Sequence, residues 1–222
     1  MSQSDNFISY QPKRFTETEM LKRSQEWFEF MNTRRSIREF SSQTFPVQIL
    51  ENAIKTGSTA PSGAHKQPWT FCIVSSAKIK KQIREAAEKE EYENYTRRMS
   101  DEWLEDLKAF GTDHIKPFLE IAPYLVIVMK HSYEIGEEEE KLTNYYVNES
   151  VGLAVGFFLS ALHNAGLFAL THTPSPMRFL KKILKRPKNE TPFLLIPVGL
   201  PPENVTVPDL KRKTSEEIIA HY

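Results

Sequence analysis

The stretch from Thr59 to Trp69, TAPSGAHKQPW, is the part of the chain that says most about its fold. It contains small residues, two prolines and one glycine, Gly63. Backbone amides beside a glycine can approach a flat ligand closely, so this composition favours a ligand-binding loop over a plain surface connection. The loop leads into WTFCIV at 69–74, a run of aromatic and β-branched residues that predicts a β-strand.

Outside this strand, the sequence predicts an irregular mixture of helices and strands, from apolar residues at helical spacing or in short β-branched runs. Helices are expected at 19–32, 46–57, 77–108 and 144–165, and strands at 69–74, 124–129, 168–173 and 193–198, with a polar loop at 131–141 and an extended segment at 201–214. Because helices and strands do not alternate strictly, we expect an α+β fold around a mixed central sheet flanked by helices. The chain is interpreted as one domain, 1–222, whose residues 1–15 form a flexible arm.

Composition and charge exclude several classes of protein. The chain has 222 residues, of which 40% are hydrophobic and 26% charged, as is typical of a folded domain with a substantial core. Lys+Arg and Asp+Glu both number 29, so no global field favours nucleic acid or a membrane surface. A single cysteine, Cys72, excludes an intramolecular disulfide, and the longest apolar run, 151–162, is shorter than the roughly 20 residues of a membrane span. The polar start lacks a secretory signal, so a cytoplasmic protein is expected.

Several common cofactor and hydrolase motifs are absent from the sequence. It contains no G-x-G-x-x-G after a strand, no G-x-x-x-x-G-K-[ST] and no G-x-S-x-G. The six histidines are scattered, and none stands at a zinc-binding spacing with Cys72 or with another histidine. A Rossmann dinucleotide site, a P-loop, a hydrolase elbow and a metal site are therefore not expected.

A basic cluster, RRSIR at 34–38, is a candidate anion site. It places three guanidinium groups within five residues, and arginine forks match phosphate oxygens. Ser36 adds a hydroxyl donor. A solvated basic turn or a nucleic-acid patch is the alternative interpretation.

A second candidate site combines an acid, a phenol and an amine. Glu91 and Tyr95 are four residues apart in a strongly charged helical segment, so they project from one face. Lys116 follows beyond a turn expected at Gly111. Together these groups can grip the ammonium and the carboxylate of an amino acid. The alternative is a solvated acidic helix with ordinary surface ion pairs.

Three small residues in the helix expected at 144–165 share one face. Gly152, Gly156 and Ser160 are spaced by four residues. Small side chains let another helix approach closely. Two interpretations stay open, namely tight packing within one subunit and a helix at the core of a dimer.

The combination of these motifs resembles the nitroreductase superfamily of flavin enzymes, and within it the iodotyrosine deiodinase family. Further matching stretches are EEYENY at 90–95 with RRM at 97–99, Lys116 ahead of Ala122-Pro123, THTP at 171–174 and VPDLKRK at 207–213. The likeness covers roughly residues 30 to 213. It implies the FMN-dependent nitroreductase fold and an intertwined homodimer.

The resemblance implies an FMN site shared between two subunits. Cofactor-binding residues carried over by position are Arg34, Arg35, Ser36, Ile37, Arg38, Ser62, Gly63, Thr171, His172, Thr173 and Arg212. Ser62 and Gly63 match loop positions that serve the flavin of the partner subunit. His172 replaces a threonine of animal members, so only its backbone role is carried over. Thr173 is the residue implied in catalysis, through a hydroxyl near flavin N5 that favours one-electron transfer.

The resemblance also implies a substrate, halogenated tyrosine. Glu91 matches the residue that pairs with the α-ammonium group. Tyr95 and Lys116 match the residues that face the α-carboxylate. Ala64 matches the position whose backbone N–H meets the substrate phenolate.

The implied reaction is the reductive removal of iodide, bromide or chloride from 3-halotyrosine by stepwise one-electron transfer from reduced FMN. NAD(P)H is the implied electron donor, directly or through a reductase. Residues 85–116 correspond to a helical substrate lid, and 200–222 to a C-terminal extension that contacts the partner subunit. The alternatives on this fold are a generic NAD(P)H nitroreductase or quinone reductase and a flavin-fragmenting enzyme. The alternative of another class is a non-catalytic phosphate- or nucleic-acid-binding module.

Overall fold

The computed structural model describes residues 7–222, and the chain divides after Arg34 into two compact units. Of the flexible arm predicted at 1–15, residues 1–6 lie outside the described residues, and residues 7–15 carry no helix or strand. Between residues 7 and 222, no helix is both long and apolar enough to cross a lipid bilayer.

Helix α1, Glu17–Asn32, is the regular element of the first unit. The Thr16 hydroxyl accepts from the Glu19 N–H, and the Glu19 carboxylate accepts from the Thr16 N–H. This capping box starts the helix two residues before the predicted position 19. None of the residues of α1 is buried, and Trp27 and Phe28 are exposed.

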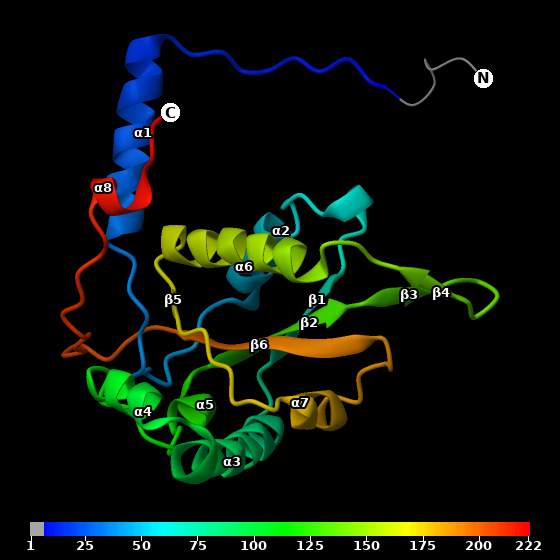
Figure 1. Cartoon of the computed structure of the whole chain (residues 1–222), viewed down its shortest axis with the longest axis vertical. Helices are drawn as coiled ribbons and strands as arrows, with labels where there is room; N and C mark the ends of the chain where they lie inside the picture. The colour runs from blue at the N-terminus through cyan, green and yellow to red at the C-terminus, as the bar shows by residue number, and fades with distance from the viewer. Residues whose placement is uncertain (1–6) are drawn as a thin grey trace. The chain divides into compact units, whose positions relative to one another are not determined.

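The second unit is built on a four-stranded sheet in the order β1-β2-β6-β5 (Figure 1). The strands are β1 (Trp69–Val74), β2 (Tyr124–His131), β6 (Glu190–Gly199) and β5 (Phe168–Ala169). Each pair of these strands is antiparallel. Within residues 7–222 a parallel contact occurs only as the bridge between Ser36 and Ala169, so the sheet is less mixed than predicted.

Strand β2 is the buried centre of this sheet. Leu125, Ile127 and Met129 belong to the apolar cluster on one face, and Val126 and Val128 to the cluster on the other. All five are fully buried. Side chains alternate between the faces of a strand, so a sheet covered on both sides separates two apolar clusters.

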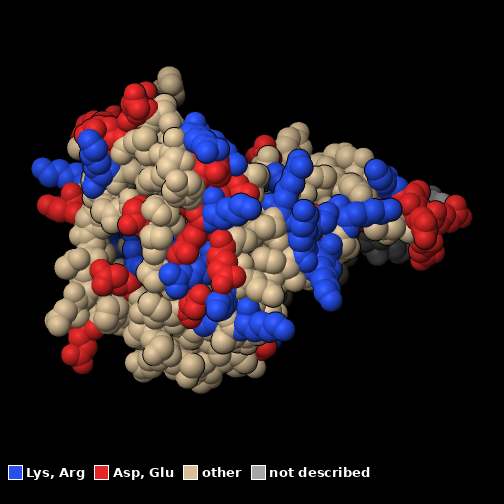
Figure 2. Space-filling model, turned by 90° about the horizontal axis from the view of Figure 1, so that it is seen from below, with Lys and Arg blue, Asp and Glu red and all other residues tan. Residues whose placement is uncertain are grey.

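Helices cover both faces of the sheet (Figure 1). On the face of Val126 lie α2 (Val47–Gly57) and α6 (Val147–Asn164), and on the face of Leu125 lie α3 (Ala77–Glu93), α5 (Phe118–Ile121) and α7 (Arg178–Ile183). The outer surface around α3 mixes acidic and basic side chains (Figure 2), with i,i+4 ion pairs such as Lys81–Glu85. Helix α3 therefore has one face in the core and one in solvent.

The small residues of α2 and α6 serve different purposes. A Cβ added at Gly57 would lie 2.9 Å from the carbonyl oxygen of Ala154 and 3.1 Å from Cβ of Phe158, so Gly57 is where the two helices approach most tightly. A Cβ added at Gly152 or Gly156 would meet no described atom within 4 Å. Tight packing within the described part of the subunit therefore does not explain the small-residue face of α6.

The polar loop predicted at 131–141 is wrong, because the structure has a hairpin there. β3 (Tyr133–Ile135) pairs antiparallel with β4 (Lys141–Thr143). Tyr133 and Ile135 alternate with polar neighbours, which is a strand pattern too short to stand out beside the run of glutamates at 137–140.

The strand predicted at 168–173 is interrupted after Ala169. The next residue, Leu170, donates to the carbonyl oxygen of Pro197 at 3.4 Å, and Pro197 has no N–H to donate elsewhere in the ladder. Pairing returns at His172, whose N–H and carbonyl bond to Leu195 at 2.9 and 3.0 Å. His172 is thus fixed to the sheet by a single bridge.

The helix predicted at 77–108 is divided into three parts. α3 ends at Glu93, a wider π-helical segment covers Asn94–Arg98, and α4 (Asp101–Lys108) begins after Ser100, whose hydroxyl accepts from the Trp103 N–H at 3.2 Å. The short helices α5, α7 and α8 (Ser215–Ile218) were not predicted either, because each spans fewer than eight residues.

Candidate active site

The acid, the phenol and the amine singled out in the sequence come together beside α3. The Lys116 ammonium lies 3.7 Å from the Glu91 carboxylate and 5.4 Å from the centre of the Tyr95 ring. The Tyr95 hydroxyl donates to the carbonyl oxygen of Thr112 at 3.3 Å. Two elements, the C-terminal end of α3 and the loop before α5, therefore form one cluster.

The loop before α5 is held to α3 by its own polar groups. The backbone N–H of Lys116 donates to the Glu88 carboxylate at 2.7 Å. The Lys116 ammonium donates to the Thr112 hydroxyl at 2.9 Å and to the carbonyl oxygen of Asp113. The lysine is thus placed by bonds from both its backbone and its side chain.

Burial perturbs both charges of this cluster. Glu91 is 6% exposed and Lys116 is 3% exposed. Burial raises the pKa of Glu91, against the lowering effect of Lys116, and burial lowers the pKa of Lys116, against the raising effect of Glu91. A buried ion pair persists only where each charge has a partner. Each charge can exchange that partner for an oppositely charged group of a ligand, so the pair can bind a zwitterion.

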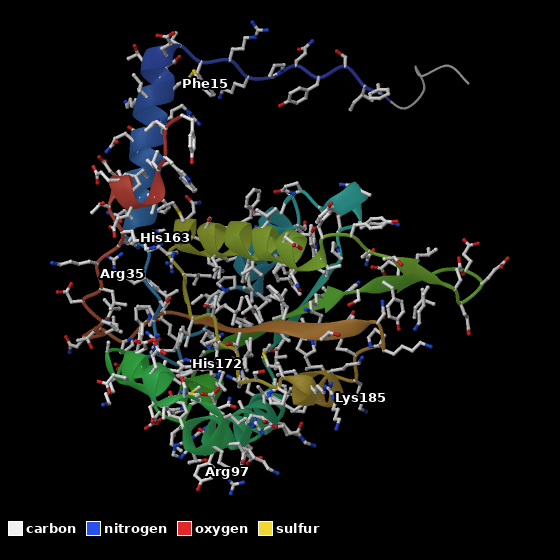
Figure 3. The ribbon with its side chains drawn as sticks, in the orientation of Figure 1. Phe15, Arg35, Arg97, His163, His172 and Lys185 are labelled. Carbon is white, nitrogen blue, oxygen red and sulfur yellow. The ribbon has the colours of Figure 1, made fainter. Side chains whose placement is uncertain are left out.

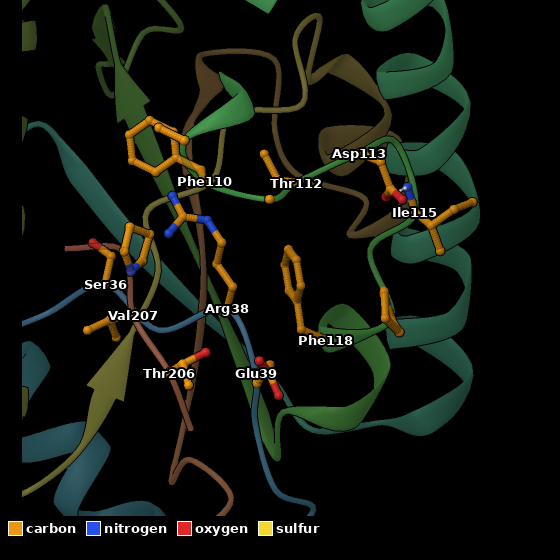
Figure 4. A pocket seen from close by; sticks show the side chains of 14 residues that line it. Ser36, Arg38, Glu39, Phe110, Thr112, Asp113, Ile115, Phe118, Thr206 and Val207 are labelled. Carbon is orange, nitrogen blue, oxygen red and sulfur yellow. Dashed lines mark hydrogen bonds between the residues drawn. The ribbon is translucent and has the colours of Figure 1, made fainter. Parts of the chain in front are cut away.

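A cavity of about 460 Å³ opens next to this cluster (Figure 4). Arg38 reaches into it with its guanidinium carbon 4.8 Å from the centre of the Phe110 ring. Burial lowers the pKa of Arg38. Among residues 7–222, no carboxylate lies within ion-pair distance of Arg38. The remaining wall is formed by Ser36, Glu39, Ala109, Gly111, Thr112, Asp113, Ile115, Pro117, Phe118, Thr206, Val207 and Pro208.

His172 lies behind the wall of this cavity, on the side of the sheet that carries α3 and α5 (Figure 3). Its ring meets Phe118 edge to face, with the ring centres 5.7 Å apart. Its Nε2 atom is buried and has no hydrogen-bond partner among the described residues. Burial, followed by the positive charges of Lys116 and Arg38, lowers the pKa of His172 to about 3. The imidazole is therefore neutral near pH 7.

The predicted loop residues adopt a strained conformation. Gly63–His65 form one 3₁₀ turn, in which Ala64 and His65 have φ of 49° and 57°. The Gly63 N–H donates to the Ser150 hydroxyl at 3.3 Å, and a Cβ at Gly63 would lie 2.8 Å from the carbonyl oxygen of Tyr145. Glycine is therefore required where the loop meets the start of α6. Non-glycine residues in the left-handed region are often found at ligand sites.

This loop is on the opposite side of the sheet from Arg38. The loop Ser62–Ala64 lies near the start of α6, where the Gly63 N–H donates to Ser150, whereas the cavity is lined by residues of α5 and of the loop before it. Helices α6 and α5 lie on opposite sides of the sheet (Figure 1). A single copy of the chain thus brings Glu91, Tyr95, Lys116, Arg38 and His172 together, and keeps Ser62, Gly63 and Ala64 apart from them.

The other predicted cofactor residues are divided between surface and core. Ile37 is buried, and its N–H donates to the carbonyl oxygen of Ala169 at 3.3 Å, so its side chain faces the apolar core. Arg35 and Arg212 are exposed and do not line the cavity. Arg34 belongs to the first unit. Thr171 and Thr173 are exposed on either side of His172.

Comparison with known proteins identifies the family. A profile of the Nitroreductase family matches residues 31–200. An iodotyrosine deiodinase from Haliscomenobacter hydrossis is 57% identical over 222 residues, which is the full length of both chains. This chain belongs to the nitroreductase family and, within it, to the iodotyrosine deiodinases. An iodotyrosine deiodinase from Hydra vulgaris is 44% identical, over 98% of this chain and 80% of that one.

Solved structures place this iodotyrosine deiodinase family member in the same fold. A crystal structure of oxidized iodotyrosine deiodinase bound to FMN and 3-iodo-L-tyrosine matches it with a TM-score of 0.75 and 30% identity, over 88% of this chain and 98% of that one. A nitroreductase with bound FMN from Bacteroides fragilis matches with a TM-score of 0.64 at 19% identity, over 88% of this chain and 99% of that one. The predicted α+β nitroreductase fold is confirmed.

Several residues of the site in this deiodinase family member were not predicted from the sequence. Phe110 and Phe118 line the cavity, and Thr112 accepts from Lys116. Asn94 and Arg98 donate to the carbonyl oxygen of Ser175. Asn94 stands inside the quoted stretch EEYENY, so its place between Glu91 and Tyr95 was a usable signal. The phenylalanines resemble ordinary core residues, and nothing in their spacing distinguishes them.

Proposed function

We propose that this chain binds FMN and removes the halogen from 3-halotyrosine reductively, releasing tyrosine and halide. The observation that carries the proposal is the buried pair of Glu91 and Lys116, with Tyr95 beside it, next to a cavity that contains Arg38. A generic reductase for flat aromatic molecules has no use for an acid and an amine buried together. Family membership and the likeness to a deiodinase bound to FMN and 3-iodo-L-tyrosine support the same conclusion.

The residues of the cavity fit FMN. Arg38 is a desolvated cation that lacks a carboxylate partner within residues 7–222, and Phe110 and Phe118 supply flat apolar walls. His172 adds a buried nitrogen whose hydrogen bond is unmade in the described chain. Unpaired buried polar groups are costly, so a ligand that pairs with them is favoured.

We assign the cofactor contacts as follows. One copy supplies Arg34, Arg35, Ser36, Ile37, Arg38, Thr171, His172, Thr173 and Arg212, and a second copy supplies Ser62 and Gly63. When bound, FMN supplies the two electrons of the reaction in single steps. The carbon–halogen bond breaks and a carbon–hydrogen bond forms, so one proton is consumed for each halide released. The Thr173 hydroxyl donates to the flavin, which makes Thr173 the catalytic residue of the proposal.

The substrate binds by exchange of partners. The substrate ammonium pairs with Glu91, and its carboxylate pairs with Lys116 and Tyr95, so both charges of the zwitterion replace the internal ion pair. The Ala64 N–H of the second copy donates to the phenolate oxygen. Residues 85–116 act as the lid that excludes water while the ligand is bound.

The division of the site supports a homodimer. The loop at Ser62 and the cavity at Arg38 lie on opposite faces of one sheet, so we assign the missing half of the site to a second copy. The face of α6 around Gly152 and Gly156 is open, and Leu153 and Phe157 are exposed on it. We place residues 200–222 against the partner, NAD(P)H or a reductase as the electron source, and the protein in the cytoplasm.

The test is a comparison of Glu91→Gln with Glu93→Gln in the FMN-bound protein. Glu91→Gln removes the charge that pairs with the ammonium, so the Kd for 3-iodotyrosine should rise by at least tenfold while FMN stays bound. Glu93 pairs with Arg97 at the surface, and its variant should bind normally. Flavin fluorescence titration measures Kd, and iodide release with dithionite measures turnover. Unchanged binding in Glu91→Gln, or rapid nitroaromatic reduction without iodide release by the unaltered protein, would overturn the proposal.

A further inference from the structure

A chain of hydrogen bonds joins the proposed substrate clamp to the loop that carries Thr173. Asn94 is 8% exposed, and its amide nitrogen donates to the carbonyl oxygen of Ser175 at 3.0 Å. The Ser175 N–H in turn donates to the carbonyl oxygen of Thr173 at 2.7 Å. At the other end, Asn94 follows Glu91 by three residues at the end of α3 and directly precedes Tyr95. Burial raises the pKa of Glu91, and Lys116 and then a side-chain hydrogen bond from Asn94 oppose that rise.

The backbone around Asn94 is built for this contact. Asn94–Arg98 is a π-helical segment, in which the Met99 N–H donates to the carbonyl oxygen of Asn94 at 2.9 Å. Single π turns inside helices are frequent at functional sites. The wider turn lets Asn94 reach Ser175 while Tyr95 reaches Thr112.

Arg98 reinforces the same contact from the far end of the π turn. Its guanidinium donates to the Asn94 side-chain oxygen at 3.1 Å and to the carbonyl oxygen of Ser175 at 3.4 Å. Its ion pair with Glu90, at 2.8 Å, holds it in place. The Ser175 carbonyl therefore accepts from two side chains of one segment.

We propose that Asn94 is a positioning residue that couples occupation of the Glu91 site to the placement of the Thr173 hydroxyl. The inference deepens the proposed function and rests on it. When a substrate ammonium replaces Lys116 as the partner of Glu91, the carboxylate that accepts from Asn94 is reoriented. Asn94 passes that change to Ser175, and Ser175 passes it to Thr173.

The coupling has a thermodynamic consequence. Two sites linked in this way influence each other equally, so a ligand that binds the clamp must change the environment of the flavin beside Thr173. Asn94 is needed for that change, whereas it contacts neither FMN nor the substrate ring in the proposal. Its loss should therefore affect turnover more than binding.

The experiment compares Asn94→Ala and Asn94→Asp with Arg97→Ala in the FMN-bound dimer. Asn94→Asp keeps the shape of the side chain but replaces the donor to Ser175 with an oxygen. Arg97 lies in the same π turn, is exposed and pairs with Glu93, so its variant is the matched control. Flavin midpoint potential is measured with and without 3-fluorotyrosine, a halotyrosine whose carbon–fluorine bond resists cleavage. Kd, kcat and KM are measured with 3-iodotyrosine.

Both Asn94 variants should keep FMN, lower kcat by more than tenfold and raise Kd by less than tenfold. They should also lose the shift in midpoint potential that 3-fluorotyrosine causes in the unaltered protein and in Arg97→Ala. Asn94→Gln, which retains an amide donor, should recover part of the shift. If the Asn94 variants fold poorly, Arg98→Ala removes the second donor to Ser175 at a half-exposed position and should reduce kcat and the shift in the same direction.

The two proposals fail separately. If Glu91→Gln binds halotyrosine as tightly as the unaltered protein, Glu91 does not bind the substrate ammonium, and the proposed function is overturned. A different result overturns only the coupling through Asn94. In that case Glu91→Gln binds halotyrosine more weakly, but Asn94→Ala keeps a normal kcat and a normal ligand-induced shift in flavin midpoint potential. The proposed function is then retained.

Discussion

His172 shows how strongly its surroundings can change a single residue. Its backbone is bridged to Leu195, its ring is packed on Phe118, and Lys116 and Arg38 place positive charge nearby. An imidazole whose pKa is lowered this far is neutral near pH 7 and offers no imidazolium as an acid there. It can still exchange a hydrogen bond with a ligand through its buried Nε2 atom.

The same residue makes the stability of the protein depend on pH. The pKa of His172 is about 3 in the folded chain against 6.5 in the unfolded one, so between these values only the unfolded chain binds the proton. Stability therefore falls as pH falls through this window, by up to about 2 kcal/mol between pH 7.5 and pH 5. Urea unfolding of FMN-free protein at both pH values should show a smaller loss for His172→Thr than for the unaltered chain. His221→Thr, in the exposed tail, should behave like the unaltered chain, and equal losses in all three would contradict the assignment.

At the scale of elements, the close contact between α2 and α6 at Gly57 offers a test of packing. Alanine in a helix is normally preferred to glycine by about 1 kcal/mol. At Gly57 the added methyl would meet the backbone of Ala154 and the side chain of Phe158 at 2.9 and 3.1 Å, so Gly57→Ala should lower the free energy of unfolding by about 1–2 kcal/mol. Lys55→Ala, on the exposed face of the same helix, should change it little. Chemical denaturation measures both, and a stabilised Gly57→Ala would show that the helices can separate at no cost.

Sequence patterns predicted some elements closely and missed others for identifiable reasons. β1 was predicted at 69–74, as observed, because its aromatic and β-branched run has no competing pattern. The break at Asn94 was missed because the charged, helix-favouring run at 77–91 and the similar run at 101–108 were read as one continuous helix. The strand at β5 was predicted to be too long, because the residue that interrupts its pairing, Pro197, lies on the facing strand and not within β5. The hairpin at 133–143 was hidden by polar composition.

The residues of the candidate site were also predicted where a local pattern marks them and missed where distant segments meet. The spacing of Glu91 and Tyr95 predicted that they share a helix face, and the family resemblance added Lys116 to them. The structure confirms that Lys116 lies beside both side chains. The hydrogen bond from Asn94 to Ser175 joins residues 81 positions apart in the sequence, and no local pattern encodes such a contact. Local spacing therefore predicts pairs on one helix, whereas a contact between distant elements requires the folded backbone or a known relative.

For the whole molecule, the proposed dimer makes a direct prediction. Phe157 is 42% exposed on the open face of α6, where a second copy would bury it. Phe157→Lys should give a folded monomer that retains little FMN, because the charge cannot be buried in an apolar interface. Ile121, 43% exposed on α5 across the sheet, provides a matched control, since Ile121→Lys should remain dimeric. Sedimentation velocity and flavin absorbance distinguish the outcomes, and a dimeric, yellow Phe157→Lys would place the interface elsewhere.

The central sheet keeps the Ser62–Ala64 loop on one side and the Arg38 cavity on the other. In the dimer that we propose, each crevice takes its lid from one polypeptide and its loop from the other. Two differently damaged copies, one defective in the lid and one in the loop, then complement each other. Paired in a heterodimer, they place both lesions in the same crevice and leave the second crevice intact. In the proposed dimer, a mixture of two inactive variants would therefore regain activity in one crevice of each heterodimer.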